Sequence, residues 1–268
     1  PTHSLSALEV KDGSLKGAAT DGDPYMHASR ENAFDIQGNS FQYIEVRMKN
    51  DTGKSAEFFW ANSTAGKDAG FVAGKERSFA CLPDNEWHVY YLYPLWDGQV
   101  TRLRMDPPED ATFEIDYIRI MQGPITQHDP KSGDWDFTRD VAGWVCSSGG
   151  TPLLSGDGGA QTQFLAERAQ LVSSAVDLKA ADFKYLYLQL TSDAPLTGHF
   201  TWSETEEATF PARNSVELKI PAGTQSVNLD PQECQYYSGD LKRLSLELSG
   251  PVGTKVTLRR MTLSDRPL

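Results

Sequence analysis

One sequence pattern occurs twice in this chain of 268 residues, and the duplication constrains the fold more than any other feature. The segment 41–48, FQYIEVRM, aligns with the segment 183–190, FKYLYLQL, without a gap. The alignment continues to a Phe-x-Trp tripeptide that ends at Trp60 in one copy and at Trp202 in the other. Order, spacing and apolar pattern agree over about eighty residues, with a period of about 140 residues. A period of this length indicates duplicated domains, because solenoid repeats are much shorter.

The boundary between the copies lies in a polar stretch with a glycine and two prolines, at 122–130. Such a composition is typical of linkers. We therefore predict two domains, residues 1–124 and residues 130–268. The second copy opens with an aromatic segment, 135–144, and the first copy has no such opening. We expect the first repeat to be truncated at its N-terminus and the native polypeptide to continue upstream.

Strand signals dominate both copies. Short segments rich in β-branched and aromatic residues are separated by Gly, Pro, Asn and Asp turns. In the first copy these segments are 43–48, 58–60, 87–93, 100–105 and 113–120. The best helical candidate, 166–171, has a length of only about two turns. Many short strands without crossover helices predict an all-β fold of two tandem antiparallel β-sandwiches.

Charge and composition exclude several classes of partner and site. The formal net charge is −12, whereas nucleic-acid binding needs a basic stripe. No apolar run of about 18 residues occurs, so we expect no membrane span. Cys81, Cys146 and Cys234 lack the paired spacing of a zinc site. A disulfide bridge between Cys146 and Cys234 and free buried thiols remain alternatives.

Alternation along the strands separates a core face from a free face, because successive side chains of a strand point to opposite sides. Ile44, Val46 and Met48 form one face, and leucines occupy the same places in the second copy, so we predict these positions as core. Trp60 and Trp202 are predicted as core as well. On the free face we place Tyr43, Glu45, Arg47, Phe59, Tyr90, Arg102 and Arg104 in the first copy, and Tyr185, Tyr187, Gln189, His199 and Arg243 in the second.

The residue types of the free face suit a sugar. Aromatic rings stack on the apolar C–H side of a pyranose, and planar polar groups make paired hydrogen bonds with neighbouring hydroxyls. The alternative is an ordinary solvated sheet face whose charges pair with one another. A loop offers a second candidate site, because an aromatic residue precedes a glycine in both copies. Trp96 stands before Gly98, and Tyr236 stands before Gly239.

The segments 96–107 and 115–119 resemble motifs of a known family. Their patterns, WxGxVxRLRMDP and IDYIR, are similar to those of bacterial galactose-binding-like jelly-roll domains. Such domains accompany secreted glycoside hydrolases, polysaccharide lyases and sulfatases, or sit on the cell surface. The resemblance implies a jelly-roll sandwich in a secreted or cell-surface bacterial protein. It also implies that a glycan binds on a sheet face or at loops along one end.

From the free face and this resemblance we expect a non-catalytic carbohydrate-binding tandem module that targets a larger secreted protein or enzyme to a polysaccharide. Its expected partners are a polysaccharide or oligosaccharide and an upstream domain of the parent polypeptide, and we expect a monomer. The alternative is a pair of structural or spacer sandwiches without their own ligand, in a cell-surface protein or a multidomain glycan-active enzyme.

No nucleophile elbow, metalloprotease motif or phosphate loop occurs in the sequence. We therefore expect no catalysis by this chain, which would at most be a fragment of a larger glycoside hydrolase, lyase or sulfatase.

The resemblance also implies a structural calcium ion in the first repeat. Asp116, Asp21 and Asp23 are the carboxylates that would bind it. The alternative is a salt bridge from Asp116 to Arg104. In the second copy Arg259 takes the place of Asp116, so no calcium ion is expected there. No other cofactor is expected.

Overall fold

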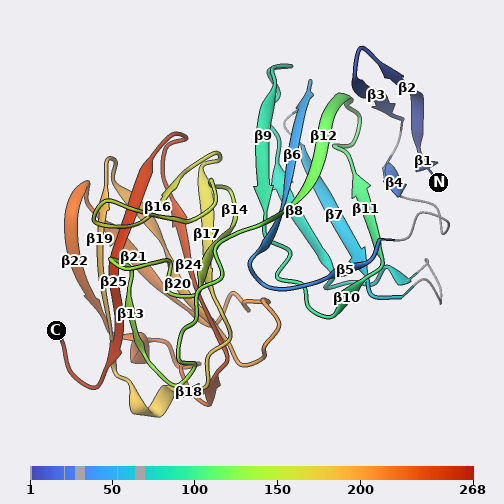
Figure 1. The fold of residues 1–268 in the computed structure, drawn as a ribbon. Coiled ribbons are helices and arrows are strands. Elements are labelled where there is room, and N and C mark those ends of the chain that lie inside the picture. The colour runs from blue at the N-terminus through green and yellow to red at the C-terminus, as the bar shows by residue number, and fades with distance from the viewer. Residues whose placement is uncertain (1, 21, 28–33, 53, 64–69) are drawn as a thin grey trace. The chain divides into compact units, whose positions relative to one another are not determined.

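The structure is a computed structural model that describes residues 2–20, 22–27, 34–52, 54–63 and 70–268. The chain divides into two compact units, Pro1–Gly123 and Pro124–Leu268, which we call unit 1 and unit 2 (Figure 1). Across the described residues the regular structure is almost entirely β-strand. Two short 3-10 helices, η3 (Ala180–Asp182) and η4 (Pro231–Glu233), lie in unit 2. No helix of the described residues is long and apolar enough to cross a membrane.

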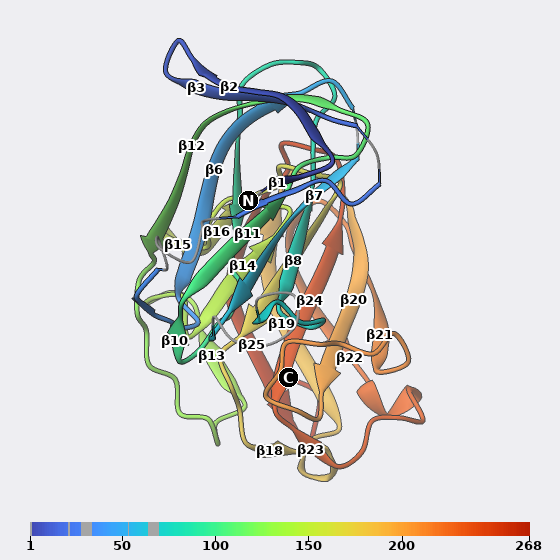
Figure 2. The same ribbon diagram turned by 90° about the vertical axis from the view of Figure 1, so that its right-hand side faces the viewer.

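The described residues of unit 1 form two five-stranded antiparallel sheets and one small strand pair. The β11 sheet has the order β1 (Thr2–His3), β4 (Tyr25–His27), β11 (Arg102–Asp106), β7 (Ser55–Ala61) and β8 (Glu76–Ala80). The β6 sheet has the order β2 (Leu5–Lys11), β3 (Ser14–Ala19), β12 (Thr112–Gln122), β6 (Gln42–Asn50) and β9 (His88–Leu92). The small pair joins β5 (Ile36–Gln37) to β10 (Gln99–Val100). Figure 2 shows β6 running beside β12, and β7 beside β11.

Unit 2 has the same construction. The β19 sheet has the order β15 (Leu154–Gly156), β16 (Gly159–Gln163), β25 (Lys255–Ser264), β19 (Tyr185–Ser192) and β22 (Gly223–Leu229), and β13 (Asp134–Asp136) also pairs with β25. The β24 sheet has the order β14 (Trp144–Ser148), β17 (Arg168–Ser173), β24 (Arg243–Ser249), β20 (Leu196–Ser203) and β21 (Ser215–Ile220). The small pair joins β18 (Leu178–Lys179) to β23 (Asp240–Leu241).

The strands of the two units correspond one to one. Strands β1 to β12 of unit 1 take the same places, in the same order, as strands β14 to β25 of unit 2. Strand β13 alone has no counterpart among the described residues of unit 1. The prediction of two tandem antiparallel β-sandwiches is therefore confirmed, and one fold is used twice.

Each unit has its own hydrophobic core between its two sheets. Ile44, Val46 and Met48 on β6 are fully buried, as are the leucines at the same places on β19. The alternating pattern creates this core, because every second side chain of a half-buried strand points inward. Trp60 and Trp202 are buried as well. The predicted core positions are thus correct in both copies.

Two local features differ from the sequence-based expectations. The helical candidate 166–171 is wrong, because its last four residues belong to strand β17. Ala169 and Leu171 are both buried, which is the two-residue period of a strand; a short apolar run cannot separate the two structures by pattern alone. The cysteines are all free, with Cys81 and Cys146 buried and Cys234 partly buried, so no Cys146–Cys234 bridge forms.

Candidate functional site

The predicted free face is divided between the two sheets of each unit. Tyr43, Glu45 and Arg47 lie on β6, whereas Arg104 and Phe59 lie on β11 and β7 in the other sheet. The prediction that these side chains share one face is wrong. Alternation shows which side chains of a strand point away from the core. Both sheets of a sandwich have an outer face, however, and the pattern does not show to which sheet a strand belongs.

The same division holds in unit 2. Tyr185, Tyr187 and Gln189 lie on β19, whereas His199 and Arg243 lie on β20 and β24 of the other sheet. The five predicted residues therefore do not form one surface.

The outer surface of the β6 sheet gathers aromatic and charged side chains, which we call the tyrosine face. It contains the three residues predicted from β6 and five more, which belong to β9, to β12 or to the position directly before β9. The register explains the gathering, because Tyr91 and Arg119 flank Glu45 on its two neighbouring strands, and Tyr117 lies beside Arg47. The members are Tyr43, Glu45, Arg47, Trp87, Tyr91, Asp116, Tyr117 and Arg119.

Glu45 lies at the centre of the tyrosine face. A hydrogen bond to Glu45 raises the pKa of Tyr117 above its usual value, with a further contribution from burial. Burial and, next, the charge of Glu45 raise the pKa of Tyr43 and of Tyr91. Arg119 approaches Glu45 to 3.8 Å and lies over the ring of Tyr117, 3.8 Å from its centroid. One carboxylate thus contacts or influences three phenols and one guanidinium.

Arg47 occupies the neighbouring part of the tyrosine face. Its guanidinium lies 4.6 Å from the ring centroid of Trp87 and forms an ion pair with Asp116. Asp116 reaches this position because the pairing of β12 with β6 shifts by one residue between Ile115 and Tyr117. A bulge of this kind turns an extra side chain out of the ladder.

Sequence reasoning missed three aromatic members of this face, Trp87, Tyr91 and Tyr117. Tyr90 was predicted as free, but it lies opposite the inward-pointing Val46, is buried, and accepts a 3.1 Å hydrogen bond from the backbone N–H of Leu82. Its neighbour Tyr91 is the side chain that points outward. The segment 88–92 has aromatic or aliphatic side chains at nearly every position, so the sequence pattern does not show which of them point inward. The pairing of β9 with β6 decides this.

The outer face of the β11 sheet centres on Arg104. The guanidinium lies 4.1 Å from the ring centroid of Tyr25 and 4.9 Å from that of Phe59. It also forms ion pairs with Asp106 at 2.6 Å and with Asp23 at 2.7 Å. Its donors are thus already engaged by protein carboxylates, which leaves this group less suited to a ligand than the tyrosine face.

Three further residues predicted as accessible are buried. Arg102 has its guanidinium 2.7 Å from Nδ1 of His27 and lies over the ring of Phe71. Trp96 packs edge-on against Trp60. In unit 2, Arg243 donates hydrogen bonds to the backbone oxygens of Glu206 and Ser173. Each prediction fails for the same reason, because loops and neighbouring strands cover these side chains.

The indole nitrogen of Trp96 also has a hydrogen-bond partner inside the protein. Its indole N–H donates a 2.7 Å hydrogen bond to Oε1 of Gln42. In the second copy Tyr237 takes the place of Trp96 and packs edge-on against Trp202 in the same way, whereas the predicted residue Tyr236 is 42% exposed. Tyr236 lines a cavity of about 540 Å³, together with Arg213, Ser215, Glu217, Glu233 and Gln235.

The outer face of the β19 sheet is the unit 2 counterpart of the tyrosine face. Tyr185, Tyr187 and Gln189 are half-buried on it, and the hydroxyl of Tyr187 lies 3.2 Å from Oγ of Ser226. Tyr187 stands where unit 1 has Glu45. The central carboxylate of unit 1 is therefore replaced by a phenol. His199, on the other sheet, is exposed.

The proposed calcium ligands do not come together in the described residues. Asp116 pairs with Arg47 on the β6 sheet, and Asp23 pairs with Arg104 on the β11 sheet. The alternative bridge from Asp116 to Arg104 is wrong as well, since those residues lie on different sheets. Asp21 lies outside the described residues. In the described part of the chain no group of three or more His, Cys, Asp or Glu side chains is placed to hold a metal ion.

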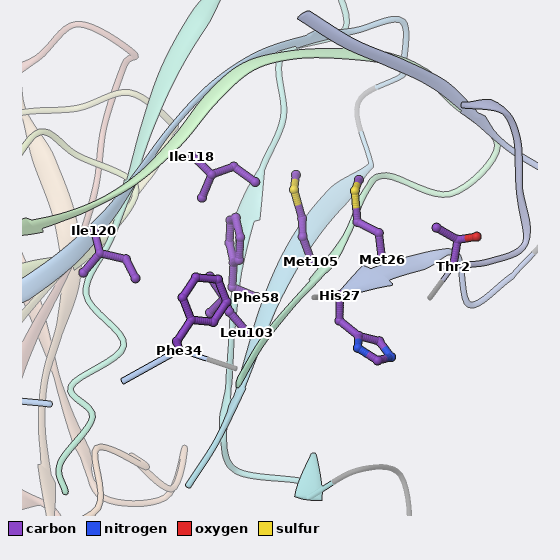
Figure 3. A pocket seen from close by; sticks show the side chains of 9 residues that line it. All are labelled: Thr2, Met26, His27, Phe34, Phe58, Leu103, Met105, Ile118 and Ile120. Carbon is purple, nitrogen blue, oxygen red and sulfur yellow. The ribbon is translucent and has the colours of Figure 1, made fainter. Parts of the chain in front are cut away.

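A further cavity of about 430 Å³ lies in unit 1 and is lined by apolar side chains (Figure 3). Ile118 and Ile120 of β12 face it from one side, and Phe58, Leu103 and Met105 face it from the other sheet. It lies between the sheets and is thus separate from the tyrosine face.

No protein-family model matches the sequence, and no curated protein matches it. Among solved structures, the chain is similar to the N-terminal CBM22-1–CBM22-2 tandem domain of Paenibacillus barcinonensis Xyn10C, at 10% identity and a TM-score of 0.31, covering 99% of this chain and 91% of that one.

Two further structures are similar to this chain. Carbohydrate-binding modules of the β-sandwich superfamily match at 8% identity and a TM-score of 0.33, with 98% and 96% of the two chains covered. A family 43 arabinoxylan arabinofuranohydrolase from Bacillus subtilis matches at 9% identity and a TM-score of 0.36. The match covers 97% of this chain and 53% of that one. The ligands named for these proteins are properties of those proteins.

Proposed function

We propose that this chain is a non-catalytic carbohydrate-binding tandem whose tyrosine face binds a segment of a polysaccharide or oligosaccharide. The observation that carries the proposal is the placement of Glu45 among Tyr43, Tyr91, Tyr117 and Arg119 on one outward sheet face. Aromatic rings with a central carboxylate and guanidinium supply both interactions that a sugar needs.

The face would bind a sugar by stacking and by paired hydrogen bonds. The half-buried rings of Tyr91 and Trp87 offer apolar surface to the C–H side of a pyranose. Glu45 accepts and Arg119 donates hydrogen bonds in planar geometry, which matches vicinal hydroxyl groups. Because the carboxylate of Glu45 already lies 3.8 Å from the guanidinium of Arg119, this polar pair is in place before a ligand arrives. Such preorganisation lowers the entropic cost of binding.

Unit 2 contributes a second, chemically different face. Tyr185 and Tyr187 supply rings, and Gln189 supplies an amide in place of Arg47. A sugar bound there would meet no carboxylate at the position of Glu45. We therefore assign the stronger site to unit 1, and two linked sites on one polymer would gain affinity through effective concentration.

The proposal extends to the setting of the protein. A tandem of this kind targets a larger secreted or cell-surface bacterial protein to a polysaccharide, without catalysis of its own. The competing function is that of spacer sandwiches without a ligand, and the same experiment separates the two.

The test is affinity electrophoresis of the chain through gels that contain plant, algal or host glycans, followed by titration calorimetry with the glycan that retards it. We expect retardation by at least one glycan, and at least tenfold weaker binding in Glu45→Gln and Tyr91→Ala. Glu9→Gln and Tyr236→Ala are matched controls, because both side chains are exposed and lie outside the tyrosine face.

Two outcomes would overturn the proposal. Absence of retardation on every glycan favours the spacer function. Retardation that survives both tyrosine-face substitutions places the sugar elsewhere, and loss in Tyr236→Ala would place it in the cavity beside Arg213.

A further inference from the structure

Strand β13 completes the core of unit 2. It pairs with β25 over three residues, with Trp135 opposite Met261. Trp135 is fully buried and meets Trp144 edge-on, with ring centroids 6.0 Å apart. Phe137, directly after the strand, packs on Trp144 in the same way. A short edge strand thus places two aromatic rings over one side of the sandwich.

The same place in unit 1 has no strand among the described residues. Strand β12 corresponds to β25, and its residues Ile118 and Ile120 correspond to Met261 and Leu263. Strand β3 pairs with β12 only over Thr112–Ile115. Beyond that point, on the side away from β6, no described strand continues the ladder. The backbone edge of β12 at 118–120, which no described strand pairs, therefore offers a template for another strand.

Side chains that are buried in unit 2 are exposed at this place in unit 1. Ile118 is 38% exposed, and its counterpart Met261 is 0% exposed. Phe34 is 37% exposed, and its counterpart Val176 is 3% exposed. Phe34 and Val176 correspond because their backbone N–H groups bond to the oxygens of Thr101 and Lys242, at equivalent places. In unit 2, Met261 and Val176 belong to the same buried core as Trp135 and Phe137.

The cavity of about 430 Å³ opens at this position (Figure 3). Its lining is mainly the side chains of methionine, phenylalanine, leucine and isoleucine, with His27 and Thr2 at one side. An apolar lining of this kind does not suit a sugar, whose hydroxyl groups would lose their hydrogen bonds to water. It suits a large apolar side chain of the kind that Trp135 places in unit 2.

We propose that this groove takes an extended peptide strand of the β13 type, with an aromatic side chain in the cavity and acidic residues on either side of it. The strand would run antiparallel to β12, bond to its edge at 118–120, and continue the β6 sheet as an added strand. Charge supports an acidic residue on the N-terminal side of the aromatic side chain. Asp134 of β13 bonds to Thr262, whose counterpart in unit 1 is Arg119 with a largely exposed guanidinium. The proposal does not rest on the tyrosine-face function, although both use Arg119.

The test uses the full chain labelled with 13C at its methionine methyl groups and a synthetic peptide that copies residues 131–138, KSGDWDFT. Met26 and Met105 line the cavity, and Met261 is the internal control because β13 already covers its place in unit 2. We expect saturable shifts of the Met26 and Met105 methyl signals and no shift of Met261. The same peptide with Trp135→Ser should bind at least tenfold more weakly.

Matched variants locate the site on the chain. Ile118→Lys puts a charge at the groove and should weaken peptide binding at least tenfold, whereas Met121→Lys, at an equally exposed place on β12, should not. Unchanged Met26 and Met105 signals, equal binding of the Trp135→Ser peptide, or equal effects of the two variants would each overturn the proposal. Dimerisation of the chain without peptide, with the same methionine shifts, would assign the groove to a second copy and also overturn it.

Discussion

Glu45 on β6 and Arg119 on β12 lie opposite each other in the sheet, with the carboxylate oxygen and the guanidinium nitrogen 3.8 Å apart. Tyr43, Tyr91 and Tyr117 all lie within the electrostatic influence of the same carboxylate. The charged groups and rings of this face therefore form one electrostatic network, and removal of the charge of Glu45 should change the pKa of all three tyrosines.

The first prediction concerns tyrosine ionisation. Burial and, next, the charge of Glu45 raise the pKa of Tyr43 and Tyr91, and Glu45 is the main cause of the raised pKa of Tyr117, because a phenolate beside a carboxylate is unfavourable. Glu45→Gln removes that charge, so the pKa of these tyrosines should fall and their ionisation should begin at lower pH. Alkaline titration followed by ultraviolet absorbance measures the change, with Glu9→Gln as the control. Identical titration curves for Glu45→Gln and the parent protein would contradict the network.

The second prediction concerns acid stability. The pKa of Glu114 is lowered to about 2, first by a hydrogen bond from Ser14 and then by Lys49, whose Nζ lies 3.0 Å away. A lowered pKa in the folded state stabilises the fold above the unfolded value of about 4.3, and this contribution is lost as pH falls toward about 2.

Glu114→Gln should therefore lower the melting temperature at pH 7. The difference from the parent protein should shrink as pH falls from about 4.3 to about 2. Thermal unfolding followed by circular dichroism across this range measures it, and Glu9→Gln should show no such pH-dependent difference. A gap between Glu114→Gln and the parent that stays constant down to pH 2 would exclude the ion-pair origin.

The third prediction concerns the core of unit 2. Trp202 is fully buried and packs against Phe200 and Tyr237. Trp202→Ala should cost about 3–5 kcal/mol of unfolding free energy, because a large ring leaves a cavity that the sheets cannot close. Urea denaturation measures this, and the exposed Tyr236→Ala should stay within about 0.5 kcal/mol of the parent protein.

The fourth prediction concerns calcium. Asp23 and Asp116 are each engaged by an arginine on a different sheet, and we propose that these ion pairs take the place of a structural cation. Addition of calcium or of a chelator should leave the melting temperature unchanged. A rise of several degrees with calcium that a chelator reverses would restore the calcium site suggested by the sequence.

The sequence alone determined the sandwich core. Ile44 and Leu186 belong to segments that alternate with period two, and Trp60 and Trp202 recur at one place in the repeat, so local pattern suffices to assign them. It also placed Tyr43, Glu45 and Arg47 correctly on the outward side of β6. These features depend only on neighbours along the chain.

Only the tertiary structure decided which outward residues meet. It separated Arg104 from Glu45 by placing their strands in different sheets, and it turned Tyr91 outward and Tyr90 inward through the register with β6. It also showed that β13 fills unit 2 at a place where the described part of unit 1 keeps an apolar groove. The physical reason is that strand pairing joins residues distant in sequence, whereas alternation records only the side of a strand on which each residue lies.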